Sequence, residues 1–227
     1  MGDTAILKTT EILEETSTGI WKVHRAPDLP KPLFGHCIAM LRNGRVVLSG
    51  GFDGNDQSDI SEEFEWLDNF SGKWSTKEWS ALNANRYDHG CFSKGGRIEL
   101  VGGWSADLSQ KLATERYDQI ARKWQKISSD TTNSNVDSAL PYILRSATLG
   151  VSEGNVALIG GVSCELESGS LAKTKCIKHK EVYELQLNVD LNVTQWKKTT
   201  NEIGLARSSH VSINVPKSIE FSCSPVV

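Results

Sequence analysis

The sequence predicts an all-β fold made of repeated units of four short antiparallel strands. Three observations predict it: a strand that ends in two glycines recurs, a tryptophan strand accompanies each copy, and turn residues separate the strands. The glycine strands are residues 44–51, 96–103 and 154–161, so they begin 52 and then 58 residues apart. A chain of 227 residues has the length of one domain, and a repeat of this period predicts a radial arrangement of small sheets.

The glycine strand alternates apolar side chains with a variable position, which is typical of a strand with one buried face. In the second copy, Ile98 and Leu100 flank the variable Glu99. The two glycines that follow allow a neighbouring backbone to approach closely or the chain to adopt a positive φ. We therefore expect this strand to lie inside each unit.

Three further strands are expected around each glycine strand. A shared opening, such as Phe34-Gly35-His36, precedes a first strand, and an acidic-aromatic third strand leads into a fourth strand that carries tryptophan. The predicted first strands are residues 37–41, 90–93, 149–151 and 211–215; the third are residues 62–67, 114–118 and 180–185; the fourth contain Trp74, Trp124 and Trp196. His36, His89 and His210 occupy one repeat position, so we interpret them as structural groups that form hydrogen bonds near the first strand.

The two ends of the chain supply the halves of one more unit. Residues 10–13 and 18–21 have the character of a third and a fourth strand, and Trp21 stands where the other units carry tryptophan. Residues 210–227 have the character of a first and a second strand. The sequence thus predicts three full units and one that is split between the termini.

This pattern resembles the kelch repeat, with its Gly-Gly strand, a Glu-x-Tyr-like strand, Thr-Gly-x-Trp at residues 18–21 and Arg-x-x-His at residues 86–89. The resemblance covers residues 5 to about 221 and implies a kelch-type β-propeller, a single domain over residues 1–227, without an attached helical BTB or F-box domain. The expected blades are residues 34–79, 86–127, 144–197, and 207–223 together with 5–25. Either a closed four-blade ring or an open partial propeller fits, the latter as a shortened product or as part of an assembly with another chain.

Charge and cysteine content restrict the partner and the compartment. A net charge of -3 and a pI near 6.0 argue against nucleic acid, and no run reaches the ~18 apolar residues that a membrane helix needs. Without a signal-like N-terminus, the five cysteines are expected as free thiols in the cytoplasm. Cys37 and Cys91 would then be small buried apolar groups on first strands. Sequons at residues 69–71 and 192–194 keep an extracellular alternative open, in which Cys164–Cys176 is the first disulfide to test.

Binding residues are expected on the loops between second and third strands and between one unit and the next, which share a face of the molecule. Loops on a rigid scaffold carry most binding residues, and exposed Trp, Tyr and Arg are the usual anchors of a protein interface. The candidate partner-binding residues are Phe52, Asp53, Arg86, Tyr87, Trp104, Asp107 and Arg207. The third such loop is basic, with Lys175, Lys178 and His179 among its residues.

No motif predicts catalysis, a metal or a cofactor. The acidic segment 53–59 lacks the Gly and the final Glu of a calcium loop, and Cys164, Cys176 and His179 fit no zinc spacing. The resemblance to kelch proteins implies a non-enzymatic protein-interaction module, a scaffold or adaptor that binds a protein partner. The alternatives are an extracellular propeller with ligand or carbohydrate contacts and, least favoured, a propeller enzyme.

Overall fold

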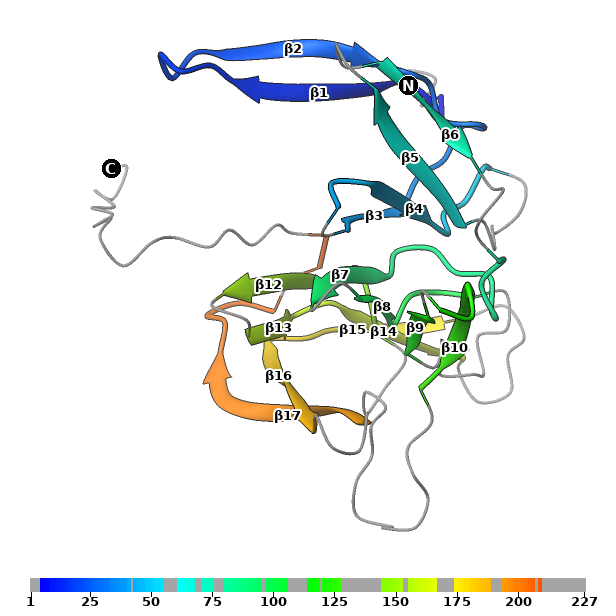
Figure 1. The fold of residues 1–227 in the computed structure, drawn as a ribbon. Coiled ribbons are helices and arrows are strands. Elements are labelled where there is room, and N and C mark those ends of the chain that lie inside the picture. The colour runs from blue at the N-terminus through cyan, green and yellow to red at the C-terminus, as the bar shows by residue number, and fades with distance from the viewer. Residues whose placement is uncertain are drawn as a thin grey trace.

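The computed structural model describes residues 5–41, 43–54, 61–67, 71–75, 80–94, 97–105, 114–118, 120–127, 144–152, 155–166, 174–188, 193–206 and 208–209. These residues form β-strands, turns and loops (Figure 1). Within them, no helix is long and apolar enough to cross a membrane.

Three antiparallel sheets have four strands each. Sheet I has β3 (Cys37–Met40), β4 (Val46–Ser49), β5 (Ser61–Leu67) and β6 (Ser71–Ser75) in order. Sheet II has β7 (Gly90–Lys94), β8 (Arg97–Val101), β9 (Glu115–Asp118) and β10 (Lys123–Lys126), and sheet III has β12 (Thr148–Ser152), β13 (Asn155–Ile159), β16 (Glu181–Asn188) and β17 (Val193–Glu202). The prediction of an all-β chain with four-stranded antiparallel sheets is confirmed.

The N-terminal hairpin is a two-stranded sheet of β1 (Thr10–Glu15) and β2 (Trp21–Ala26). Its turn is closed by backbone hydrogen bonds between Thr16 and Ile20 and between Gly19 and Thr16, each 2.9 Å. Gly19 has a φ of 75°, which glycine adopts without steric cost. The first and second strands predicted within residues 210–227 lie outside the described residues.

A small side sheet was not expected from the sequence. It contains β11 (Leu144–Arg145), β14 (Val162–Leu166) and β15 (Thr174–Lys178), in the order β11–β14–β15. The prediction of a basic loop in this part of the third unit is therefore wrong: β15 belongs to a hairpin with β14. Lys175 and Lys178 are exposed on it, whereas His179 is buried.

Apolar clusters join sheet II to sheet I and sheet III to sheet II. Trp124 of sheet II, 4% exposed, shares a cluster with Ala39 and Val47 of sheet I. Trp196 of sheet III, 6% exposed, shares a cluster with Phe92 of sheet II in the same way. These two tryptophans are packing residues, whereas Trp21, at the same repeat position of the hairpin, is 60% exposed.

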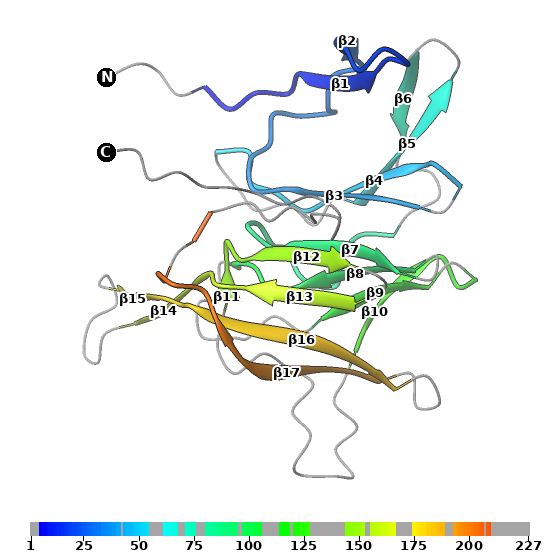
Figure 2. The ribbon, with the colours of Figure 1, turned by 90° about the vertical axis from the view of Figure 1, so that its left-hand side faces the viewer.

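A series of backbone hydrogen bonds connects equivalent positions of successive units. Asp88 donates to the Gly35 carbonyl at 2.7 Å, Ser146 to the Asp88 carbonyl at 2.9 Å, and Ser209 to the Ser146 carbonyl at 2.8 Å. All four residues have a positive φ, between 51° and 63°. The innermost strands β3, β7 and β12 follow one another in the same order (Figure 2).

The double glycines permit this close approach of neighbouring units. Gly50, with a φ of 56°, lies against the Arg86 carbonyl and the His89 ring, so a Cβ there would overlap both. The next residue, Gly51, donates its N–H to the Arg86 carbonyl at 2.9 Å. Glycine is required at position 50 both for the backbone conformation and for contact between sheets.

Candidate functional site

Three aromatic rings from two distant parts of the chain meet at one edge of the sheets; we call Phe34, Phe52 and Tyr87 the aromatic cluster. The ring centroids of Phe34 and Phe52 lie 5.2 Å apart, those of Phe34 and Tyr87 5.9 Å, and those of Phe52 and Tyr87 5.5 Å. Phe34 is 43% exposed, and the other two are half-buried. Such arrangements stabilise aromatic groups beyond the burial of area, yet one ring still faces solvent.

Backbone pairing positions these rings. Phe34, which precedes β3, forms an antiparallel bridge with Phe52, which follows β4. Tyr87, which precedes β7, forms the equivalent bridge with Trp104, which follows β8. The structure therefore brings the predicted face together: residues before the first strand lie beside residues after the second.

One ion pair borders the aromatic cluster. Lys31 Nζ lies 3.2 Å from Asp53 Oδ2, and both side chains are partly exposed. Asp53 follows Phe52 directly, so a charged and hydrogen-bonding group adjoins the apolar rings. An apolar centre with a polar rim is the composition of a protein-binding surface.

The prediction that Arg86 is an exposed anchor is wrong. Arg86 is 0% exposed, and its guanidinium is bound to the Glu115 carboxylate and, at 3.0 Å, to the Gly102 carbonyl. Glu115 also accepts hydrogen bonds from Asn83 N and Nδ2, both at 2.8 Å. The Arg86 side chain thus fixes the segment before β7 to β8 and β9 of the same sheet and cannot contact a partner.

The remaining candidates fall into two groups. Phe52, Asp53, Tyr87 and Trp104 lie at the edge just described, and Trp104 is half-buried there. Asp107 and Arg207 lie outside the described residues. Phe34 was missed as a site residue, although it stands at the repeat position of Tyr87; that equivalence was the signal that could have identified it.

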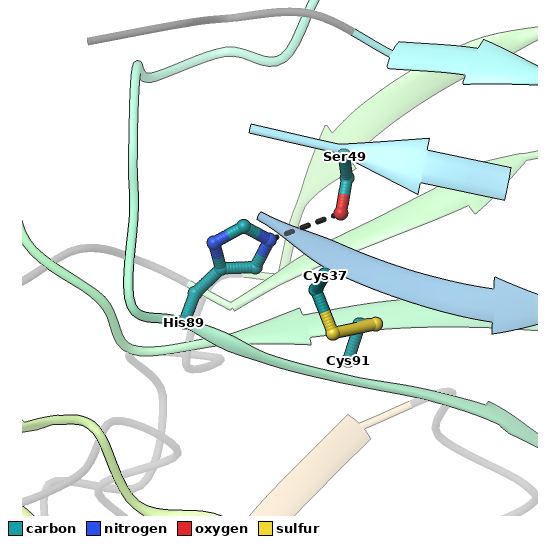
Figure 3. The surroundings of a disulfide bond; sticks show 4 residues. All are labelled: Cys37, Ser49, His89 and Cys91. Atoms are coloured by element: carbon teal, nitrogen blue, oxygen red, sulfur yellow. Dashed lines mark hydrogen bonds between the residues drawn. A yellow bond between two sulfur atoms is a disulfide. The ribbon is translucent and has the colours of Figure 1, made fainter. Parts of the chain in front are cut away.

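A disulfide between Cys37 and Cys91 joins β3 to β7 (Figure 3). The expectation that both are free thiols is wrong, because the inner strands of adjacent sheets bring two positions 54 residues apart within bonding distance. Beside them, His89 Nε2 and Ser49 Oγ form a 3.0 Å hydrogen bond across the same junction. The structural role expected of His89 is confirmed by this bond.

The buried position of His89 predicts a dependence of stability on pH. Burial, followed by the charges of Arg86 and His36, holds the pKa of His89 well below 6.5. Near pH 6.5 the His89 side chain takes up a proton in the unfolded chain but stays neutral in the folded chain. The contribution of His89 to the free energy of unfolding is therefore fully present above pH 6.5 and decreases as the pH falls below it.

We therefore expect the free energy of unfolding to decrease by about 1 kcal/mol between pH 6.5 and 5.5 through His89. His36, whose pKa burial also lowers, adds to the decrease. Urea titrations at both pH values measure it. His89→Gln, whose amide can still bond Ser49, should flatten the dependence; an unchanged slope would contradict the assignment.

A second buried serine–histidine contact lies on the side sheet. Ser163 Oγ and His179 Nε2 are 2.7 Å apart, and His179 Nδ1 lies 3.4 Å from Glu181 Oε2. A serine, a histidine and a carboxylate in this order are the groups of a hydrolase triad. Here Ser163 is 7% exposed and pairs on both sides with β11 and β15, so the contact holds strands together and does not present a nucleophile.

The second disulfide joins Cys164 of β14 to Cys176 of β15, which are directly opposite in the strand register. Both sulfur atoms are part of the disulfide and therefore cannot serve as thiolate ligands for zinc beside His179. In the part of the chain that the structure describes, no cluster of three or more His, Cys, Asp or Glu could hold a metal ion.

Comparison with known proteins gives one distant similarity. An F-box/kelch-repeat protein of Arabidopsis thaliana is 35% identical over 113 residues, which is 45% of this chain and 23% of that protein. The chain is a distant, partial relative of a kelch-repeat protein. No family model matches it. This chain spans about a quarter of its kelch-repeat relative, so the relation supports the repeat pattern and leaves the whole protein's activity to be proposed.

Proposed function

We propose that this chain is a kelch-type β-propeller module that binds a protein partner through the aromatic cluster. The observation that carries the proposal is the meeting of Phe34, Phe52 and Tyr87, with Phe34 43% exposed. The three rings are held by the backbone bridges of Phe34 with Phe52 and of Tyr87 with Trp104, and the Cys37–Cys91 disulfide joins the strands that follow Phe34 and Tyr87, so little ordering of the site accompanies binding. Preorganised aromatic anchors beside a charged rim favour affinity in protein recognition.

The kelch similarity and the repeated sheets support the propeller part of this proposal. Sheets I to III each contain four antiparallel strands, and a cluster that includes the tryptophan strand joins each of sheets II and III to the preceding sheet. The relative is an F-box/kelch-repeat protein, of which 113 residues align with this chain. We base the proposed role of a scaffold or adaptor on that similarity together with the aromatic cluster.

Replacing Phe34 with Ser should lower the capture of specific partners at least tenfold, which is about 1.4 kcal/mol, the size expected of an interface anchor. Immobilised protein is incubated with an extract, and bound proteins are quantified by mass spectrometry. Ile177→Ser is the matched control, because Ile177 is 52% exposed on β15, outside the aromatic cluster. If both variants capture the same set as the parent chain, the aromatic cluster is not the binding surface.

The two disulfides favour an oxidising compartment over the cytoplasm that the sequence led us to expect. Disulfides persist in secreted and extracellular proteins and are rare in the cytosol. We therefore propose that the module works outside the cytosol. Alkylating the protein from its natural source without reductant, and then measuring its mass, tests whether the two disulfides form. Alkylation of all four cysteines, at positions 37, 91, 164 and 176, would show free thiols and would favour the cytoplasm instead.

A further inference from the structure

The Cys164–Cys176 disulfide joins a buried residue to an exposed one. Cys164, in the middle strand β14 of the side sheet, is 4% exposed. Cys176 of β15 is exposed, and so are its neighbours Lys175 and Ile177. Because successive side chains of a strand point to opposite faces, both faces of β15 meet solvent at this point. A reactant in solution therefore reaches this disulfide from the side of Cys176 and not from that of Cys164.

The position of β15 in the side sheet keeps this approach open. Within the described residues, β15 pairs with β14 alone. Cys176 lies directly opposite Cys164 in the register, and their Cα atoms are 4.1 Å apart, close to the spacing of a pair that exchanges no backbone hydrogen bonds. The hydrogen bond from His179 N to the Gly161 carbonyl, at 2.9 Å, follows the same alternation. The backbone bonds between β14 and β15 thus belong to the neighbouring residue pairs and are kept when the disulfide opens.

Two lysines surround Cys176 with positive charge. Lys178 lies two residues beyond Cys176, so the two side chains share a face of β15, and Lys175 precedes Cys176 directly. Both lysines are exposed. An ammonium group raises the local concentration of an anionic reactant and favours a thiolate beside it. The surroundings of Cys176 are therefore suited to a small thiol that carries negative charge.

The Cys37–Cys91 disulfide differs from it in access and in local charge. Both of its cysteines are half-buried, and the bond lies between the inner strands of sheets I and II (Figure 3). In the sequence, no lysine or arginine stands within two residues of either cysteine. Access is one of the factors that determine the rate of thiol–disulfide exchange, so we expect the two disulfides of this molecule to react at different rates.

We propose that Cys176 is a site of reversible modification by a small anionic thiol. The thiolate of the reactant attacks Cys176 Sγ, and the bond between the two cysteine sulfurs breaks. Its electron pair goes to Cys164 Sγ, which takes up a proton in place of the one that the reactant lost, while the reactant and Cys176 form a mixed disulfide. The strand register holds Cys164 opposite, so Cys164 can attack Cys176 Sγ in return and expel the reactant. This chemistry does not depend on the partner binding proposed for the aromatic cluster.

Glutathione, which is anionic at neutral pH, is the probe for this site. The oxidised full chain is incubated with glutathione, samples are stopped with acid, free thiols are alkylated, and the peptides are mapped by mass spectrometry. The Cys164–Cys176 disulfide should open about tenfold faster than Cys37–Cys91, and the trapped mixed disulfides should carry glutathione on Cys176. Equal or faster opening of Cys37–Cys91, or glutathione on Cys164, would overturn the proposal.

Two variants test the charge and the reversibility separately. Lys178→Gln should lower the rate of opening by glutathione about threefold at low salt and should not lower the rate with cysteamine, a cationic thiol. Lys123→Gln, which removes an exposed lysine of sheet II, is the matched control and should change neither rate. Cys164→Ser, loaded at Cys176 with glutathione disulfide, should keep its mixed disulfide after dilution, whereas the parent chain should lose it. The proposal is wrong if Lys178→Gln behaves like Lys123→Gln, or if the parent keeps its mixed disulfide as long as Cys164→Ser does.

Discussion

Replacing Glu115 with Ala should lower the free energy of unfolding by about 3–5 kcal/mol, the largest effect expected of one side chain in this molecule. Glu115 and Arg86 are both 0% exposed and form an ion pair. Removing the carboxylate leaves the guanidinium without its counter-charge in a place that water does not reach. It also removes the acceptor that Asn83 N and Nδ2 use, and an unmade buried hydrogen bond adds to the loss.

Urea unfolding monitored by tryptophan fluorescence measures the change. The control is Lys180→Ala, which breaks the exposed ion pair of Lys180 and Glu202 at 2.6 Å and should cost at most about 1 kcal/mol. The double variant Arg86→Met/Glu115→Leu should be more stable than Glu115→Ala, because no unpaired charge remains. Equal decreases in the free energy of unfolding for Glu115→Ala and Lys180→Ala would show that the buried Arg86–Glu115 pair contributes no more than an exposed ion pair.

Removing the Cys37–Cys91 disulfide should lower the free energy of unfolding by about 4 kcal/mol. The bond closes a loop with a sequence separation of 54, and the chain-entropy relation gives about 4 kcal/mol for a loop of that size. Reduction lets the unfolded chain explore many more conformations, while Gly51, Asp88 and Ser49 keep their hydrogen bonds between sheets I and II in the folded state.

The other disulfide provides the matched comparison. Cys164 and Cys176 are separated by 12 residues, for which the same relation gives about 3 kcal/mol. Urea unfolding of Cys37→Ala/Cys91→Ala and of Cys164→Ala/Cys176→Ala, each against the parent chain, should therefore rank the first pair as the more important by about 1 kcal/mol. The reverse order would mean that folded-state packing, rather than loop closure, sets the contribution of these bonds.

The repeated strands were predictable because their signals are local. Alternation around Ile98 and Leu100, with glycines immediately after, defines a buried strand within eight residues, and both side chains are at most 1% exposed. Trp124 and Trp196 were likewise predictable as packing residues, because a repeat position has a repeated environment. Trp21 departs from this rule: it is 60% exposed, and in the described part of the chain its hairpin forms a sheet of two strands, β1 and β2.

The errors concern pairs of residues distant in sequence. Arg86 alone resembles an exposed anchor, but Glu115, 29 residues later, forms a buried ion pair with it. Cys37 and Cys91 resembled free thiols because their spacing has no meaning until the inner strands of two sheets lie side by side. The lysines of β15 led to the prediction of a loop. Exposed charged residues are compatible with a strand of a hairpin too, and only its pairing with β14 shows that this segment is a strand.

The Cys37–Cys91 bond also determines how the molecule responds to tension. If a force separates the two ends of the chain, the segment between the cysteines, whose sequence separation is 54, cannot be extended, so about 190 Å of contour length is not released at ~3.5 Å per residue. All four strands of sheet I, β3 to β6, lie within that protected length, which ends at the start of β7. Tethered at its ends, the molecule would stretch from its N-terminal hairpin and from β8 onward, while Phe52 and Tyr87 of the aromatic cluster stay within the closed segment and Phe34, which precedes Cys37, does not.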